Sequence, residues 1–205
     1  MNLERWLNLM RVFGYGDNAA AWRELSRAYS EAHRSYHTAR HIETCLGLLD
    51  EFVALAEKPH EVELALWFHD AVYQPLSNSN ELKSAELAAR FLRDNAAQSD
   101  VVERVYRLIM VTRHTEQAQT RDEALLLDID LAILGAEVDE YAEYETGIRK
   151  EYQLIPSLVY RRKRAAILRG FLGREQIYLN EAFRLRFEPR ARVNLAAAIA
   201  KLVGQ

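Results

Sequence analysis

The segment Leu64-Ala65-Leu66-Trp67-Phe68-His69-Asp70 places a histidine and an aspartate directly after a run of apolar residues. Such a run belongs in a protein core, so we expect His69 and Asp70 to be buried with it. A buried carboxylate without a partner costs roughly several kcal/mol, so it must lose its charge or find a cation. A bound metal ion would remove this penalty for the imidazole and the carboxylate together.

A second histidine-containing segment, Tyr36-His37-Thr38-Ala39-Arg40-His41-Ile42, lies earlier in the chain. His37 and His41 are four residues apart, a spacing that brings two side chains to one face of a helix. We expect a helix from about Thr38 to Glu57, in which His41 and Cys45 lie on the apolar line. His41 is therefore expected to face the core.

The composition predicts an all-α protein that forms a single domain over residues 1–205. The chain has 205 residues with only 8 Gly and 4 Pro, and it is rich in Ala, Leu, Glu and Arg. The metal-site core is expected over about residues 30–135, with C-terminal helices over 138–205 packing on it. Expected helices cover about Leu3–Val12, Ala19–His33, Thr38–Glu57, His60–Tyr73, Glu81–Asp94 with Ser79 or Asn80 as its cap, Gln98–His114 and Asp122–Leu127, then three or four more with breaks at Pro156, Gly173 and Pro189.

Charge and cysteine content exclude several classes of protein. A net charge of -3 with 28% charged residues disfavours a nucleic-acid-binding protein. The single cysteine, Cys45, excludes an internal disulfide and a cysteine-based zinc site. No run approaches the roughly 18 apolar residues of a membrane span, and residues 1–13 lack a clean signal-peptide core. We expect a cytoplasmic protein without nucleic-acid or membrane partners, and a homodimer is left open.

The candidate metal ligands combine imidazoles with carboxylates. This set suits a divalent ion such as Mn, Fe, Co or Zn and would accept Mg, as one ion or two. Asp128 is expected to cap a helix that starts near Asp130 rather than to bind metal. The candidates, in chain order, are His37, His41, His69, Asp70, Asp128 and Asp130.

The order of His41, His69-Asp70 and Asp130 resembles the HD superfamily of metal-dependent phosphohydrolases, which is all-helical. The segment from Tyr36 to His41 is also similar to the Tyr-His-Asn-x-x-His motif of cyclic-nucleotide phosphodiesterases, with Thr38 in place of Asn. In those enzymes the first histidine donates a proton to the leaving oxygen and the second binds metal. The resemblance therefore implies these roles for His37 and His41. Their further histidine pair after His-Asp has no counterpart here, so their substrate is not carried over.

A closer resemblance is to a group of small bacterial proteins predicted to be HD-type phosphohydrolases, and it covers nearly the whole chain. The shared motifs are Tyr-His-x-x-x-His-Ile from Tyr36, Phe-His-Asp-x-x-Tyr from Phe68, Asn-Glu-x-x-Ser-Ala from Asn80 and Asp-x-Asp-Leu-x-Ile-Leu-Gly from Asp128. A closing segment, Phe171–Leu195, is also similar, with Ile-Tyr and Ala-Arg-x-Asn-Leu sequences. The resemblance implies an HD-like helical bundle with a metal site.

These patterns together predict metal-dependent hydrolysis of a phosphate ester or anhydride, on a nucleotide or a similar small metabolite. One alternative is a non-catalytic metal-containing module that senses a nucleotide, and another is a structural protein whose polar core holds no ion. Glu81 and His114 also have simpler explanations, because an acid near a helix start and a histidine near a helix end are both favoured by the helix dipole. The expected metal ligands are His41, His69, Asp70 and Asp130; the expected catalytic residues are His37, Asp70 and Glu81; the expected substrate contacts are Lys83 and His114, the latter also a candidate for a second ion.

Overall fold

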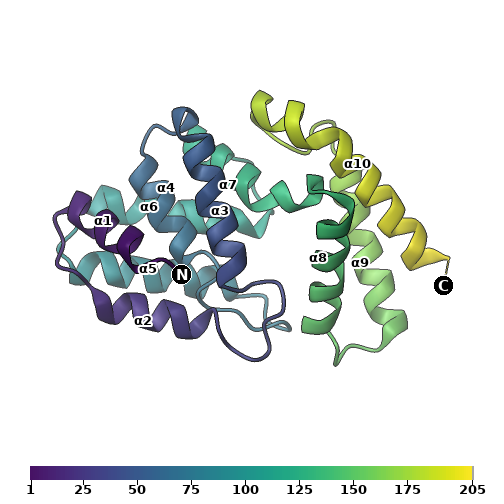
Figure 1. Cartoon of the computed structure of the whole chain (residues 1–205), viewed down its shortest axis with the longest axis horizontal. Coiled ribbons are helices and arrows are strands. Elements are labelled where there is room, and N and C mark those ends of the chain that lie inside the picture. The colour runs from purple at the N-terminus through teal and green to yellow at the C-terminus, as the bar shows by residue number, and fades with distance from the viewer. Residues whose placement is uncertain (205) are drawn as a thin grey trace. The chain divides into compact units, whose positions relative to one another are not determined.

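The computed structural model describes residues 1–204, and within that range every regular element is a helix (Figure 1). The predicted all-α class is confirmed. None of these helices is long and apolar enough to cross a membrane. The chain divides into two compact units, Met1–Ile129 and a second that begins at Asp130. The α-helices are α1 Leu3–Phe13, α2 Ala19–Ala28, α3 Ala39–Glu51, α4 Pro59–Phe68, α5 Asn80–Asp94, α6 Ser99–Met110, α7 Arg121–Leu131, α8 Val138–Glu151, α9 Ser157–Leu172 and α10 Glu181–Val203; the short 3-10 helices are η1 Val53–Leu55, η2 Val111–Arg113 and η3 Ala132–Gly135.

Helix α4 forms the centre of the first unit. Each residue from Leu64 to Phe68 is at most 2% exposed, and α4 packs against α1, α3, α5 and α6. The Trp67 ring meets Trp6 edge to face, with 5.6 Å between the ring centroids. The run Leu64–Phe68 is apolar on every side, and such a segment is stable only inside a core, which is where the sequence predicted it.

Two of the predicted helices in the first unit end earlier than expected, beside the site. Helix α2 ends at Ala28 rather than His33, because Tyr29 turns inward and its hydroxyl donates to the carbonyl of Trp67 at 3.0 Å. Helix α4 ends at Phe68 rather than Tyr73. The carbonyls that would continue it accept bonds from a side chain, Arg34, instead of from backbone N–H groups of a next turn.

Four local predictions about helix ends were also wrong. Neither Ser79 nor Asn80 caps α5 through its side chain, because the Asn80 amide bonds to the backbone of Gln74. Asp128 is not a cap, since it lies inside α7 and is 0% exposed. Helix α3 ends at Glu51 and α6 at Met110, each followed by a 3-10 turn where the sequence predicted a continuous helix.

The second unit consists of α8, α9 and α10 around η3. Pro156 precedes α9 and Gly173 follows it, as predicted. The predicted break at Pro189 was wrong, because Pro189 lies inside α10. Leu185, four residues earlier, is exposed, so water can bond the carbonyl that loses its N–H partner.

Helix α10 holds η3 through a close backbone contact and a side-chain amide. A Cβ on Gly135 would overlap the backbone of Phe187, so only glycine permits this approach. The Asn194 amide donates to the carbonyls of Leu134 and Ala136, both at 3.0 Å. The Asp-x-Asp-Leu-x-Ile-Leu-Gly motif and the closing segment therefore bind each other.

Candidate metal centre

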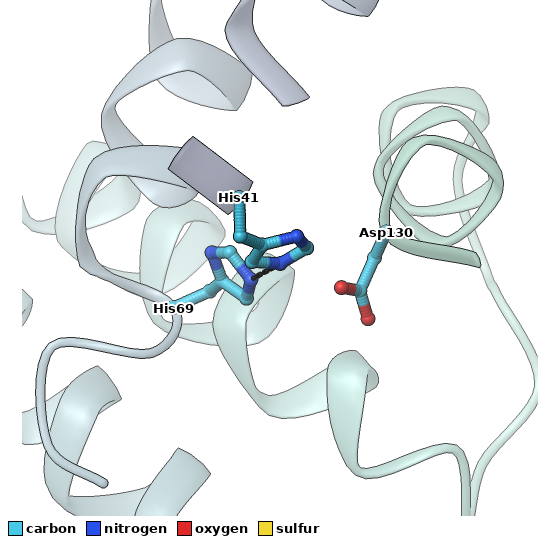
Figure 2. Close-up of side chains that lie close together, drawn as sticks. All are labelled: His41, His69 and Asp130. Atoms are coloured by element: carbon cyan, nitrogen blue, oxygen red, sulfur yellow. Dashed lines mark hydrogen bonds between the residues drawn. The ribbon is translucent and has the colours of Figure 1, made fainter. Parts of the chain in front are cut away.

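Three of the four predicted metal ligands form a group that could hold a metal ion. His41 comes from α3, His69 is the residue that follows α4, and Asp130 is on α7, a single unbroken helix. One ligand atom from each lies within 4.8 Å of the others. Figure 2 shows the two imidazoles side by side, with the carboxylate of Asp130 directed toward them. His41 and His69 are 6% and 1% exposed.

The fourth predicted ligand, Asp70, lies against the same two imidazoles. Its Oδ2 is 3.1 Å from Nε2 of His69 and 3.6 Å from Nε2 of His41. Burial alone would raise the pKa of Asp70, but positive charge on His69, His37 and His41 outweighs it and holds the pKa well below its usual range. Asp70 is therefore an ionised carboxylate, the form that binds a metal.

The hydrogen bond behind His69 determines which of its nitrogens faces the cluster as an acceptor. Nδ1 lies 3.0 Å from the carbonyl oxygen of Leu66, which can only accept, so Nδ1 carries the proton. A neutral His69 then directs the lone pair of Nε2 toward the cluster, where Nε2 of His41 is 3.2 Å away. Metal-ligating histidines are commonly oriented in this way by a backbone carbonyl.

The lone pairs of His41 Nε2, His69 Nε2 and Asp70 Oδ2 face one another and would repel without a proton or a metal ion between them. The separations of these three atoms are 3.1, 3.2 and 3.6 Å. Two atoms each about 2.1 Å from one ion are about 3.0 Å apart at a right angle and about 3.4 Å apart at a tetrahedral angle. A proton on one imidazole would satisfy one pair, whereas a divalent ion satisfies all three atoms at these distances.

His37 lies beside the cluster but does not share a helix with His41. Helix α3 begins at Ala39, so His37 precedes it, and the expected common helical face was wrong. Its ring stacks on Tyr73 with 4.2 Å between centroids, and its charge contributes to the low pKa of Asp70. Stacking on the turn after His69, rather than helical spacing, holds His37 near the ligands.

The Asn-Glu-x-x-Ser-Ala motif proves to hold the backbone that follows the His-Asp pair. Ser84 Oγ accepts the N–H of Val72 at 3.0 Å. The Asn80 amide accepts the N–H of Gln74 at 3.0 Å and donates to its carbonyl at 2.9 Å. These hydroxyl and amide groups give the motif a structural role that the sequence reading did not assign.

Besides His37 and Asp70, three predicted site residues, Glu81, Lys83 and His114, are outside the metal-capable group found among residues 1–204. Glu81 is half-buried in the first turn of α5, and Lys83 is exposed on the same helix. His114 is half-buried and follows η2 with a positive φ of 55°. Their proposed contacts with substrate or a second ion stay predictions.

Sequence reading missed a tyrosine in the second unit that interacts with Asp130. The hydroxyl of Tyr144 accepts a hydrogen bond from the buried Arg164 at 2.8 Å. Burial raises the pKa of Tyr144 against the lowering effect of Arg164, and the carboxylates of Glu145 and Asp130 add to the rise. Several tyrosines occur in this segment of the sequence, and nothing in the sequence distinguishes Tyr144 as the one near Asp130.

Sequence analysis also assigned no role to Arg34. Its side chain is 0% exposed and bonds to the carbonyls of Asp70 and Ala71. No periodic pattern marks an arginine whose partners are backbone atoms far along the chain.

Comparisons with known proteins found no similar sequence or structure. No family model, no curated protein and no solved structure matches the chain.

Proposed function

We propose that the chain is a metal-dependent phosphohydrolase with an HD-like fold. Its substrate is a phosphate ester or anhydride of a nucleotide or a similar small metabolite. The observation that carries the proposal is the convergence of His41 Nε2, His69 Nε2 and Asp70 Oδ2 within 3.1–3.6 Å. The order of these residues and Asp130 in the sequence resembles the HD superfamily, which supports the phosphohydrolase assignment.

The residues that would hold the ion are His41, His69, Asp70 and Asp130. Their nitrogen and oxygen donors suit Mn, Fe, Co or Zn, and Mg is also compatible. A divalent ion held by them supplies a Lewis acid for a phosphoryl oxygen and lowers the pKa of a coordinated water.

Two further roles in the reaction fall to side chains of the proposed site. Asp70 would orient the attacking water, and His37 would act as the general acid. Asp70 stays ionised and can accept a hydrogen bond from the attacking water, which orients the water oxygen toward phosphorus. His37 donates a proton to the leaving oxygen as the bond between phosphorus and that oxygen breaks. A charged His37 lowers the pKa of Asp70, so the proposed proton donor and the carboxylate interact within one site.

The test combines metal analysis with a substrate screen. Protein purified without chelator should contain about one equivalent or more of a divalent metal. With Mn or Co added, it should hydrolyse at least one of a set of nucleoside phosphates, cyclic nucleotides and an aryl phosphate. His69→Ala should abolish this turnover, whereas His60→Ala, an exposed histidine on α4, should leave it unchanged.

Two outcomes would contradict the proposal. Bound metal without turnover of any substrate would favour the nucleotide-sensing alternative. Failure to bind a divalent ion even after loading would favour a structural protein with a polar core.

A further inference from the structure

Arg34 is a buried cation that bonds to backbone around the candidate metal centre. Its Nη1 donates to the carbonyl oxygens of His37 and Asp70 at 3.1 and 2.7 Å. Its Nη2 donates to the carbonyl of Ala71 at 3.0 Å, and its Nε donates to the carboxylate of Glu31 at 3.0 Å. One guanidinium therefore joins the backbone before α3 to the turn after α4.

The surroundings of this guanidinium fix it in place. Its central carbon lies 5.1 Å from the ring centroid of Tyr29 and 5.4 Å from that of Tyr73. Aromatic faces stabilise a cation, and Tyr73 is the ring on which His37 stacks. A fully buried guanidinium is stable only when its N–H groups donate hydrogen bonds. Arg34 donates four, each to an oxygen atom, and its side chain is 0% exposed.

The geometry points to Arg34 as the positioning residue of the metal centre. Its bonds to the carbonyls of His37, Asp70 and Ala71 set the spacing between the proton donor and the turn that carries two metal ligands. This inference rests on the proposed function, because it assigns Arg34 to the same site. Only a planar guanidinium reaches these carbonyls together, since an ammonium is a point donor on a flexible stem.

Arg192 is a matched control in the second unit. It donates to the carbonyls of Leu172, Arg174 and Glu175 and to the carboxylate of Glu188. Its chemistry is thus the same, three carbonyls and one carboxylate, although its side chain is 36% exposed. The segment that it holds carries none of the proposed ligands.

The experiment measures Mn²⁺ affinity by isothermal titration calorimetry, together with unfolding temperature and hydrolysis, for the whole chain. Arg34→Lys should weaken Mn²⁺ binding by about 10- to 100-fold, the usual effect of removing an outer partner of metal ligands. Arg192→Lys should leave Mn²⁺ affinity within about twofold of wild type, whatever its unfolding temperature, because it acts on stability alone. Glu31→Gln removes the charge of the carboxylate that accepts from Arg34, and the Glu31 side chain is about half exposed. This variant should also weaken Mn²⁺ binding, but by less than Arg34→Lys does.

Equal Mn²⁺ affinity in wild type and Arg34→Lys would overturn the inference. Should Arg34→Lys fail to fold, Glu31→Gln decides: weaker binding supports the positioning role, and unchanged binding overturns it. A wild type that binds Mn²⁺ but hydrolyses nothing would contradict the proposed function alone, while the affinity difference would still support Arg34. A wild type that binds no Mn²⁺ would overturn both.

Discussion

Residues 62–68 of α4 and the turn 69–74 that follows them are continuous in sequence but are held by opposite kinds of interaction. The helical residues are fixed by apolar packing, for example of Trp67 on Trp6. The turn is fixed by hydrogen bonds from polar side chains elsewhere in the first unit, namely His33, Arg34, Asn80 and Ser84. The hydrophobic effect is non-directional, so the packing of apolar side chains contributes stability without fixing orientations. Hydrogen bonds are directional, so those to the turn determine how its side chains are oriented.

The comparison implies that stability and site geometry can be altered separately. Changes to the apolar part should lower the free energy of unfolding strongly. Changes to the polar part should lower it less and should affect metal binding or local opening of the turn more.

The largest effect is expected from Trp67→Ala in the apolar part. Removal of a fully buried indole should lower the free energy of unfolding by about 3–5 kcal/mol, through lost burial and a residual cavity. Urea denaturation followed by circular dichroism measures this change. The control Leu76→Ala, at a position 67% exposed, should change the free energy by less than about 0.5 kcal/mol. A loss of similar size in both variants would show that apolar burial does not distinguish the two regions.

An intermediate effect is expected from pH on metal affinity, which probes the polar part. The pKa of Asp70 lies well below its usual range, so this carboxylate stays ionised between pH 8 and pH 5.5. Protons compete with metal ions for imidazole ligands in general, so a site that uses imidazole nitrogens should lose Mn²⁺ affinity by about 10- to 100-fold as the pH is lowered over this range. Calorimetric titrations in a buffer series measure the affinity. Affinity that is constant or that rises toward acid pH would exclude imidazole ligation.

The smallest effect is expected from Asn80→Ala, which removes two bonds to the backbone of Gln74. The free energy of unfolding should fall by about 1 kcal/mol, because Gln74 is exposed and water replaces part of what is lost. Amide hydrogen exchange should quicken at Val72 and Gln74 before it does in α4. Asn80→Asp is the companion variant, since it keeps the acceptor for the Gln74 N–H but replaces the amide donor with a carboxylate oxygen that faces the Gln74 carbonyl. Uniform faster exchange along α4 would mean that the turn and the helix open together.

Much of the candidate site was predictable because its signals are local. His41 lies on the apolar line of its helix, and His69 follows a continuous apolar run, so burial of both could be read from periodicity. The predicted helix ends were less accurate. Residues 29–33 and 69–73 have helical composition, but tertiary hydrogen bonds from Tyr29 and Arg34 take the chain out of the helix there.

The sequence by itself determined the helical class, the burial of α4, and the identity of the two imidazoles and the carboxylate, His41, His69 and Asp130, that form the metal-capable group. The tertiary structure alone decided that Arg34 is buried, that Asn80 binds the backbone of Gln74 rather than capping a helix, that Ser84 binds the backbone of Val72, and that His37 stacks on Tyr73. The physical reason is the distance along the chain over which each kind of interaction acts. Composition and periodicity report what a residue prefers among its chain neighbours, whereas the partners of a guanidinium, an amide or a hydroxyl are atoms that only folding brings within reach.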